Sequence, residues 1–225
     1  MNSNRWITFD CFGTLIDWHS GFSAILHPIF GDRISDLLRE YHQFERQLEA
    51  ERPHRLYKDV LASSLQRAAE ELSITVDSSK VKALPESWDS LRPFHDVEPA
   101  LAALRRAGFH LAVLTNCDDD LFAITQSAFT HPFDLVVTAE HVCDYKPSLA
   151  HFRFFSRVTG VEDGNWVHVA CSWFHDIAPA RDLGIKRVWL DRDQTGEDRT
   201  AATHCLRSAT DLPDAVAELF EQSSN

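Results

Sequence analysis

Apolar runs that alternate with amphipathic segments dominate the chain from residue 93 onward. Four of these runs are long enough for buried strands, and a segment with apolar residues at helical spacing follows each of them. A further apolar run, residues 6–9, lies near the N-terminus. Strands that alternate with helices favour an α/β fold, and we expect a doubly wound parallel sheet of five strands. The expected strands cover residues 6–9, 110–115, 134–139, 166–170 and 187–190, and the expected helices cover residues 97–107, 119–128, 148–158, 177–183 and 211–218.

Residues 17–91 show a different pattern, without a clear strand. Two series of apolar residues recur there at helical spacing, from Ile34 to Leu48 and from Val60 to Leu72. Pro53 and Pro85 fall between the helical stretches, as helix-breaking residues should. We therefore expect a helical cap domain of residues 17–91, inserted into a core domain made of residues 1–16 and 92–225.

The composition limits the classes of function. The 225 residues are 44% hydrophobic, and 34 acidic against 22 basic residues give a formal net charge of −12. Such an acidic surface argues against nonspecific binding to nucleic acid or to an anionic membrane. No apolar run reaches the roughly 18 residues that span a bilayer, and the N-terminus leads into the first strand without a signal-peptide pattern. The five cysteines show no metal-ligand spacing and indicate reduced thiols, so we expect a cytoplasmic protein.

Polar residues stand just beyond the predicted strands. Asp10 and Thr14 follow the first strand, Thr115 and Asn116 follow the second, and Lys146 and Asp176 come after the third and fourth. The carboxyl ends of parallel strands share one edge, where open α/β sheets bind ligands. Lys146 beside Asp10 would keep that carboxylate charged, and a carboxylate in a cleft can act as a nucleophile. Asp10 alone could simply cap its own turn, but the ordered set favours an active site.

Four of these segments carry a resemblance to a known family. Phe9–Leu15 (FDCFGTL), Leu114–Asn116 (LTN), Tyr145–Pro147 (YKP) and Asp176 resemble, in this order, the four motifs of the haloacid dehalogenase superfamily. The resemblance extends over nearly the whole chain and is strongest to the (S)-2-haloacid dehalogenase branch, which has a helical cap after the first strand. Ile34–Arg39 resembles the cap segment whose arginine meets the substrate carboxylate and the leaving halide. The resemblance assigns this role to Arg39, for which a solvated surface residue is the alternative.

The resemblance implies a mechanism in two steps. Asp10 attacks the carbon that carries the leaving group and forms an aspartyl ester, which water then hydrolyses. Lys146 orients Asp10 and keeps it charged, while Asp176 positions Lys146 or the hydrolytic water. The remaining predicted site residues are Thr14, Thr115 and Asn116, which hydrogen-bond Asp10 or the substrate carboxylate, and Phe12 and Trp173, which form an apolar wall.

Two positions argue against the phosphatases of the same superfamily. These enzymes usually carry a second aspartate two residues after the nucleophile, where this chain has Phe12, which cannot transfer a proton. An aspartate that binds Mg²⁺ usually follows the fourth strand, where this chain has Cys171, a poor ligand for a hard cation. We therefore expect no metal site and no cofactor. Weak Mg²⁺ binding between Asp10 and Asp176 belongs to the phosphatase alternative.

Other departures leave the substrate open. Typical haloacid dehalogenases have tyrosines at the positions of Phe12 and Phe152, and a serine and an asparagine at the positions of Cys171 and Trp173. That asparagine assists ester hydrolysis. The stretch from His175 onward is closer to hydrolases of the same branch that open azetidine-2-carboxylate, and His175 itself is expected to pack at a helix start, with a general base as the alternative.

The expected function is metal-independent cleavage of the carbon–halide bond of a small 2-haloacid. The alternatives are C–N hydrolysis of azetidine-2-carboxylate, a Mg²⁺-dependent phosphatase and a non-catalytic protein that binds a small acid. A small carboxylic acid is the expected partner, and a homodimer is left open.

Overall fold

The computed structural model describes residues 4–221 and contains a six-stranded parallel sheet in the order β3-β2-β1-β4-β5-β6. The strands are β1 (Trp6–Phe9), β2 (His110–Thr115), β3 (Leu135–Thr138), β4 (Trp166–Ala170), β5 (Lys186–Leu190) and β6 (His204–Leu206). The parallel α/β sheet expected from the sequence is confirmed, but the expected number of five strands is wrong. The strand that was missed, β6, has only three residues, and all of them are half-buried. It pairs with β5 at the edge of the sheet, so no long apolar run marks it in the sequence.

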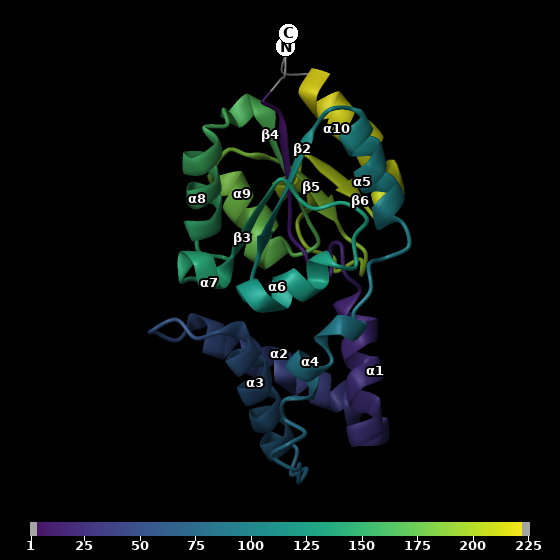
Figure 1. Ribbon diagram of the computed structural model, residues 1–225, viewed down its shortest axis with the longest axis vertical. Helices are drawn as coiled ribbons and strands as arrows, with labels where there is room; N and C mark the ends of the chain where they lie inside the picture. Colours follow the sequence, from purple (N-terminus) through teal and green to yellow (C-terminus); the bar gives the residue numbers. More distant parts are fainter. Residues whose placement is uncertain (1–3, 222–225) are drawn as a thin grey trace.

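Alternate residues of the strands point to opposite faces, and helices cover both faces (Figure 1). In β2, Leu111 and Val113 belong to the same apolar core as α5 (Val97–Arg106) and α10 (Leu212–Glu221). Ala112 and Leu114 belong to the core on the other face, with α8 (Ala150–Thr159) and α9 (Ala178–Asp182). Burial on both faces explains why the strands read as nearly continuous apolar runs.

The register brings the carboxyl ends of β1, β2 and β4 within two residues of one another. Phe9, the last residue of β1, pairs with Val113 of β2 on one side and with Val169 of β4 on the other. Asp10 therefore emerges in the middle of the sheet edge, between the segments that follow β2 and β4.

Four helices lie between β1 and α5 in the chain and gather beyond this edge of the sheet (Figure 1). They are α1 (Trp18–Phe30), α2 (Ile34–Ala50), α3 (Tyr57–Glu71) and α4 (Ala83–Glu86). Each of the two long helices α2 and α3 buries apolar residues at helical spacing, and the two helices pack against each other. The division into a cap and a core domain remains a prediction, and residues 1–3 and 222–225 of the predicted core lie outside the described residues.

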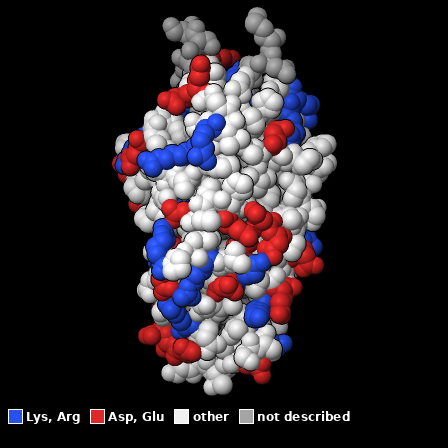
Figure 2. Space-filling model, turned by 60° about the vertical axis from the view of Figure 1, so that its left-hand side comes forward, with Lys and Arg blue, Asp and Glu red and all other residues white. Residues whose placement is uncertain are grey.

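Short elements complete the chain. They are α6 (Asp119–Gln126), α7 (Ala139–Val142), the 3-10 helices η1 (Gly31–Arg33), η2 (Trp88–Ser90), η3 (Asp163–Asn165), η5 (Arg199–Ala201) and η6 (Ala209–Asp211), and a π-helical turn, η4 (Trp173–Ile177). None of the described helices combines the length and the hydropathy needed to cross a membrane. On the face drawn in Figure 2, acidic side chains gather around the middle of the molecule, and basic side chains lie in several separate groups.

Candidate active site

The turn after β1 holds Asp10 in place at the sheet edge. The backbone N–H of Asp10 donates to the Val169 carbonyl (3.0 Å), and the Thr14 hydroxyl donates to Asp10 Oδ2 (2.7 Å). Gly13 has a φ of +88°, and a Cβ atom there would lie 2.7 Å from the Cys171 sulfur. Only glycine fits this turn without displacing a neighbour, because it tolerates both the left-handed backbone and the close approach.

The buried side chain of Lys146 lies between the carboxylates of Asp10 and Asp176. Its Nζ donates to Asp10 Oδ1 (2.9 Å), to Asp176 Oδ1 (2.6 Å) and to the Leu114 carbonyl (2.9 Å). Burial alone would lower the pKa of Lys146, but the two carboxylates outweigh it and raise the pKa. Burial opposes ionisation of Asp176 as well, yet Lys146 and His168 lower the pKa of Asp176 to about 2. The lysine and Asp176 therefore form a charged pair inside the protein.

Asn116 fixes the backbone of Lys146. Its side-chain Nδ2 donates to the Lys146 carbonyl (3.0 Å), and its Oδ1 accepts from the Lys146 N–H (2.7 Å). The neighbouring Thr115 Oγ1 is buried and has no hydrogen-bond partner among the described residues. Thr115 thus offers a free hydroxyl to a ligand, whereas the amide of Asn116 already serves the loop that carries the lysine.

A buried histidine that the sequence analysis did not single out supports Asp176. His168 Nε2 lies 3.1 Å from Asp176 Oδ1, and its Nδ1 lies 2.8 Å from the Thr8 hydroxyl. The Trp166 indole donates to the same hydroxyl (2.8 Å). Because a carboxylate only accepts hydrogen bonds, Nε2 carries the proton and donates to Asp176. The signal in the sequence was a histidine in the middle of an apolar strand.

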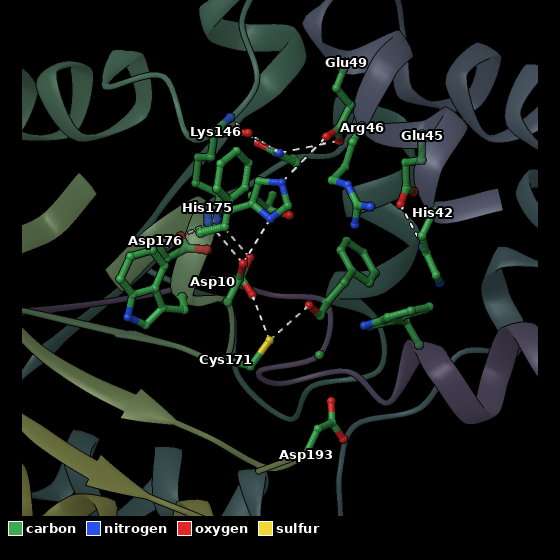
Figure 3. A pocket seen from close by; sticks show the side chains of 18 of the residues that line it. Asp10, His42, Glu45, Arg46, Glu49, Lys146, Cys171, His175, Asp176 and Asp193 are labelled. Carbon is green, nitrogen blue, oxygen red and sulfur yellow. Dashed lines mark hydrogen bonds and ion pairs between the residues drawn. The ribbon is translucent and has the colours of Figure 1, made fainter. Parts of the chain in front are cut away.

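A cavity of about 460 Å³ opens above Asp10, between the sheet edge and the helices before α5 (Figure 3). Aromatic side chains form much of its wall, including Phe12, Trp18, Trp88 and Trp173. Phe12 packs edge-on against Trp88, with ring centroids 5.0 Å apart. The cavity suits a small molecule that has an apolar part and a polar part.

Helix α2 adds a row of charged and polar residues to this cavity. His42, Glu45, Arg46 and Glu49 follow helical spacing and all line it. Burial works against ionisation of Glu45, but hydrogen bonds from His42 and two tyrosines lower its pKa. Burial, followed by the charge of Glu45, raises the pKa of Glu49 well above its ordinary value. The helix therefore presents two carboxyl groups, whose pKa values shift in opposite directions, beside the guanidinium of Arg46.

The structure brings most of the predicted site residues together. Asp10, Phe12, Thr115, Asn116, Lys146, Trp173 and Asp176 line the cavity, and Thr14 holds Asp10 from behind. The structure does not bring Arg39 to the cavity: its side chain is 63% exposed and pairs with Asp36 (2.9 Å) and Glu40 (3.4 Å). Arg39 lies about one helical turn before His42, the first residue of α2 that lines the cavity. Arg46, on the same face, lines the cavity in its place.

The donor atoms around Asp10 fit a divalent cation poorly. The ammonium of Lys146 lies between Asp10 and Asp176, the pair to which the phosphatase alternative assigned weak Mg²⁺ binding. Cys171, at the place where a third oxygen ligand would be needed, has a thiol whose pKa is raised by burial and by Asp10. Among residues 4–221, no three histidine, cysteine or acidic side chains form a group that could hold a metal.

Comparison with known proteins places the chain in a family. It is 25% identical to an (S)-2-haloacid dehalogenase of Pseudomonas putida, over 94% of this chain and 96% of that protein. Its fold superposes on the L-2-haloacid dehalogenase RSc1362 with a TM-score of 0.86 at 21% identity, covering 95% of this chain and 98% of the other. The TM-score is 0.81 at 19% identity for the L-2-haloacid dehalogenase of Xanthobacter autotrophicus with chloropropionic acid covalently bound, over 95% and 98% of the two chains. The sequence profile of the haloacid dehalogenase-like hydrolases matches residues 5–169, and this chain therefore belongs to that family of hydrolases.

Proposed function

We propose that this protein hydrolyses the carbon–halogen bond of a small 2-haloacid through an ester on Asp10, without a metal ion. The observation that carries the proposal is the setting of the Asp10 carboxylate. One oxygen accepts from Lys146 and the other from Thr14, and the group faces a cavity with aromatic walls. A fixed carboxylate in such a place can attack a carbon atom that a bound substrate brings close.

In the first step, an oxygen of Asp10 forms a bond to the α-carbon while the carbon–halogen bond breaks, and its electron pair leaves with the halide. A halide needs no proton to leave, which agrees with an apolar residue, Phe12, at the position where phosphatases have a general acid. The guanidinium of Arg46 and the free hydroxyl of Thr115 are the groups that we assign to the substrate carboxylate.

In the second step, water attacks Cγ of the Asp10 ester, and the bond from Cγ to the Asp10 oxygen that joined the α-carbon breaks. That oxygen leaves as the hydroxyl of a 2-hydroxyacid, and the water oxygen stays in Asp10. Lys146 donates to Asp10 in the free enzyme and stabilises the negative charge that develops on the ester oxygen. The ammonium of Lys146 thereby provides the positive charge that a metal ion provides beside other carboxylate nucleophiles.

A second candidate is hydrolysis of a ring C–N bond, as in azetidine-2-carboxylate. The observation that favours it is the acidic lining of the cavity: Glu45, Glu49, Asp193 and Glu197 face it in addition to Asp10 and Asp176, against Arg46 and Lys146. Such a field attracts a substrate with a cationic ring nitrogen as well as a carboxylate. A ring nitrogen that is already cationic leaves as a neutral amine and needs no proton from the protein.

A single-turnover experiment distinguishes these candidates. The protein, in EDTA and H₂¹⁸O, is mixed with substoichiometric (S)-2-chloropropionate or azetidine-2-carboxylate, and the intact mass is followed with time. We expect an adduct on the wild type that disappears and leaves ¹⁸O in Asp10, and no adduct or product with Asp10→Asn. Product from only one of the two compounds identifies the leaving group. Failure with both compounds, together with Mg²⁺-dependent release of phosphate from phosphomonoesters, would refute the proposal in favour of a phosphatase.

A further inference from the structure

Hydrolysis of an ester on Asp10 needs a group that takes a proton from water. The resemblance to the (S)-2-haloacid dehalogenases places Trp173 where those enzymes have an asparagine that assists this step, and neither an amide nor an indole takes a proton from water. Asp176 is a weak base, because Lys146 and His168 overcome the effect of burial and lower its pKa to about 2. The site therefore lacks an evident base among the residues that the family motifs mark.

The π-helical turn after β4 brings an additional side chain to the cavity. Residues 172–176 are consecutive in sequence and all line it, which the wider turn of a π-helix allows. One of them is His175, whose Nδ1 lies 3.0 Å from the Ser172 hydroxyl, and that hydroxyl also accepts from the His175 backbone N–H (3.1 Å). Ser172 thus fixes the ring. In Figure 3 the ring lies between Glu49 and Asp10.

Nε2, the other ring nitrogen of His175, faces Glu49 of α2. His175 Nε2 lies 3.9 Å from Glu49 Oε2, within reach of an ion pair and too far for a hydrogen bond. Two segments that are far apart in the chain, α2 and η4, therefore meet above the nucleophile through these two side chains. The imidazole is 27% exposed, so water can reach it.

Burial of His175 favours a neutral ring that can accept a proton. Burial lowers its pKa below the ordinary value of 6.5. The other groups that act on it are Asp176, Asp10 and Glu45, which raise its pKa, and Lys146, which lowers it. Burial raises the pKa of Glu49 well above its ordinary value. Its Oε2, 3.9 Å from Nε2, is placed to stabilise the imidazolium that forms when His175 takes a proton.

We propose that His175 is the general base of ester hydrolysis and that Glu49 is its positioning partner, an inference that rests on the proposed function. Nε2 takes a proton from water as the water oxygen forms a bond to Cγ of Asp10. The bond between Cγ and the ester oxygen that is joined to the α-carbon then breaks, and the leaving alkoxide takes the proton from His175. Asp10, now a carboxylic acid that contains the water oxygen, releases its proton to solvent.

The test separates the two half-reactions in His175→Gln. Rapid mixing with (S)-2-chloropropionate is expected to release one equivalent of chloride at the wild-type rate, while ester hydrolysis slows by about 10²–10⁴-fold. The adduct on Asp10 should then persist in the intact mass spectrum. The matched control is His131→Gln, which changes an exposed histidine between α6 and β3 and should behave as the wild type. Coincident thermal unfolding curves show that both variants are folded.

The pH profile supplies a second readout. The rate of ester hydrolysis in the wild type should fall as the pH decreases through the pKa of His175, and this acid limb should be missing in His175→Gln. Glu49→Gln should slow ester hydrolysis and move the limb to lower pH, because the imidazolium loses its partner.

Three results would overturn the inference. Normal turnover of His175→Gln without an adduct would show that His175 is not the general base. An equal slowing of chloride release and ester hydrolysis would show the same, and both results would leave the proposed function intact. If the wild type forms neither adduct nor product, the proposed function itself fails.

Discussion

Replacing Asp96 by asparagine tests how the start of α5 is anchored to the loop that follows β5. Both oxygens of Asp96 accept from the Arg192 guanidinium (3.0 Å each), and Oδ2 also accepts from the Ser208 hydroxyl (2.7 Å) and the Ala209 N–H (2.8 Å). Arg192 in turn donates to the Thr14 carbonyl (3.1 Å), in the turn that holds the nucleophile. Asp96→Asn keeps the shape but removes the charge and turns an amide N–H toward the guanidinium.

The magnitude follows from the pKa of Asp96. Burial favours its neutral form, but hydrogen bonds from Arg192, Ser208 and Ala209 outweigh this and lower the pKa from 3.8 to about 2. At about 1.36 kcal/mol per pH unit, the ionised carboxylate contributes about 2 kcal/mol more to the free energy of unfolding than the neutral acid, which asparagine resembles. For a protein of this size, the variant should unfold about 4–8 °C below the wild type.

Urea unfolding followed by tryptophan fluorescence measures this difference as a function of pH. The folded pKa is depressed, so the contribution is complete above the unfolded pKa of 3.8 and disappears as the pH falls through about 2. The two proteins should differ by about 2 kcal/mol at pH 7 and converge in acid. Asp163→Asn, an exposed control, should change stability by less than about 0.5 kcal/mol. A change of less than about 0.5 kcal/mol in Asp96→Asn, or a change that does not vary with pH, would refute the reasoning.

Three further predictions concern the site. Lys146→Met leaves two buried carboxylates without their cation. Urea unfolding should show a free energy of unfolding lower by about 3–5 kcal/mol, and the intact mass should show that no ester forms. Arg46→Gln should raise KM for the acid substrate about 10–100-fold, whereas Arg39→Gln should not change it; the opposite result would restore Arg39 as the substrate contact. Treatment with EDTA should leave chloride release unchanged, and recovery on adding Mg²⁺ would contradict a metal-independent reaction.

Much of the core could be predicted because local patterns specify it. The bounds of β2 and β4 match the expected runs at both ends. Each run is mostly apolar, and glycine or a polar residue lies within two positions of each end. The convergence of Asp10, Lys146 and Asp176 followed from topology alone, since the carboxyl ends of parallel strands share one edge. No cap helix has to be placed to reach that conclusion.

What the sequence by itself determined is therefore the parallel sheet and the cluster of charged groups at its edge. Only the tertiary structure decided which residues of α2 reach that cluster, because helical spacing specifies a face but not the position of the helix along its axis. It placed Arg46 and Glu49 at the cavity and Arg39 outside it. It also set His168 behind Asp176 and His175 opposite Glu49. These contacts depend on how separately folded segments dock, and docking is a property of the packed core that no single stretch of sequence carries.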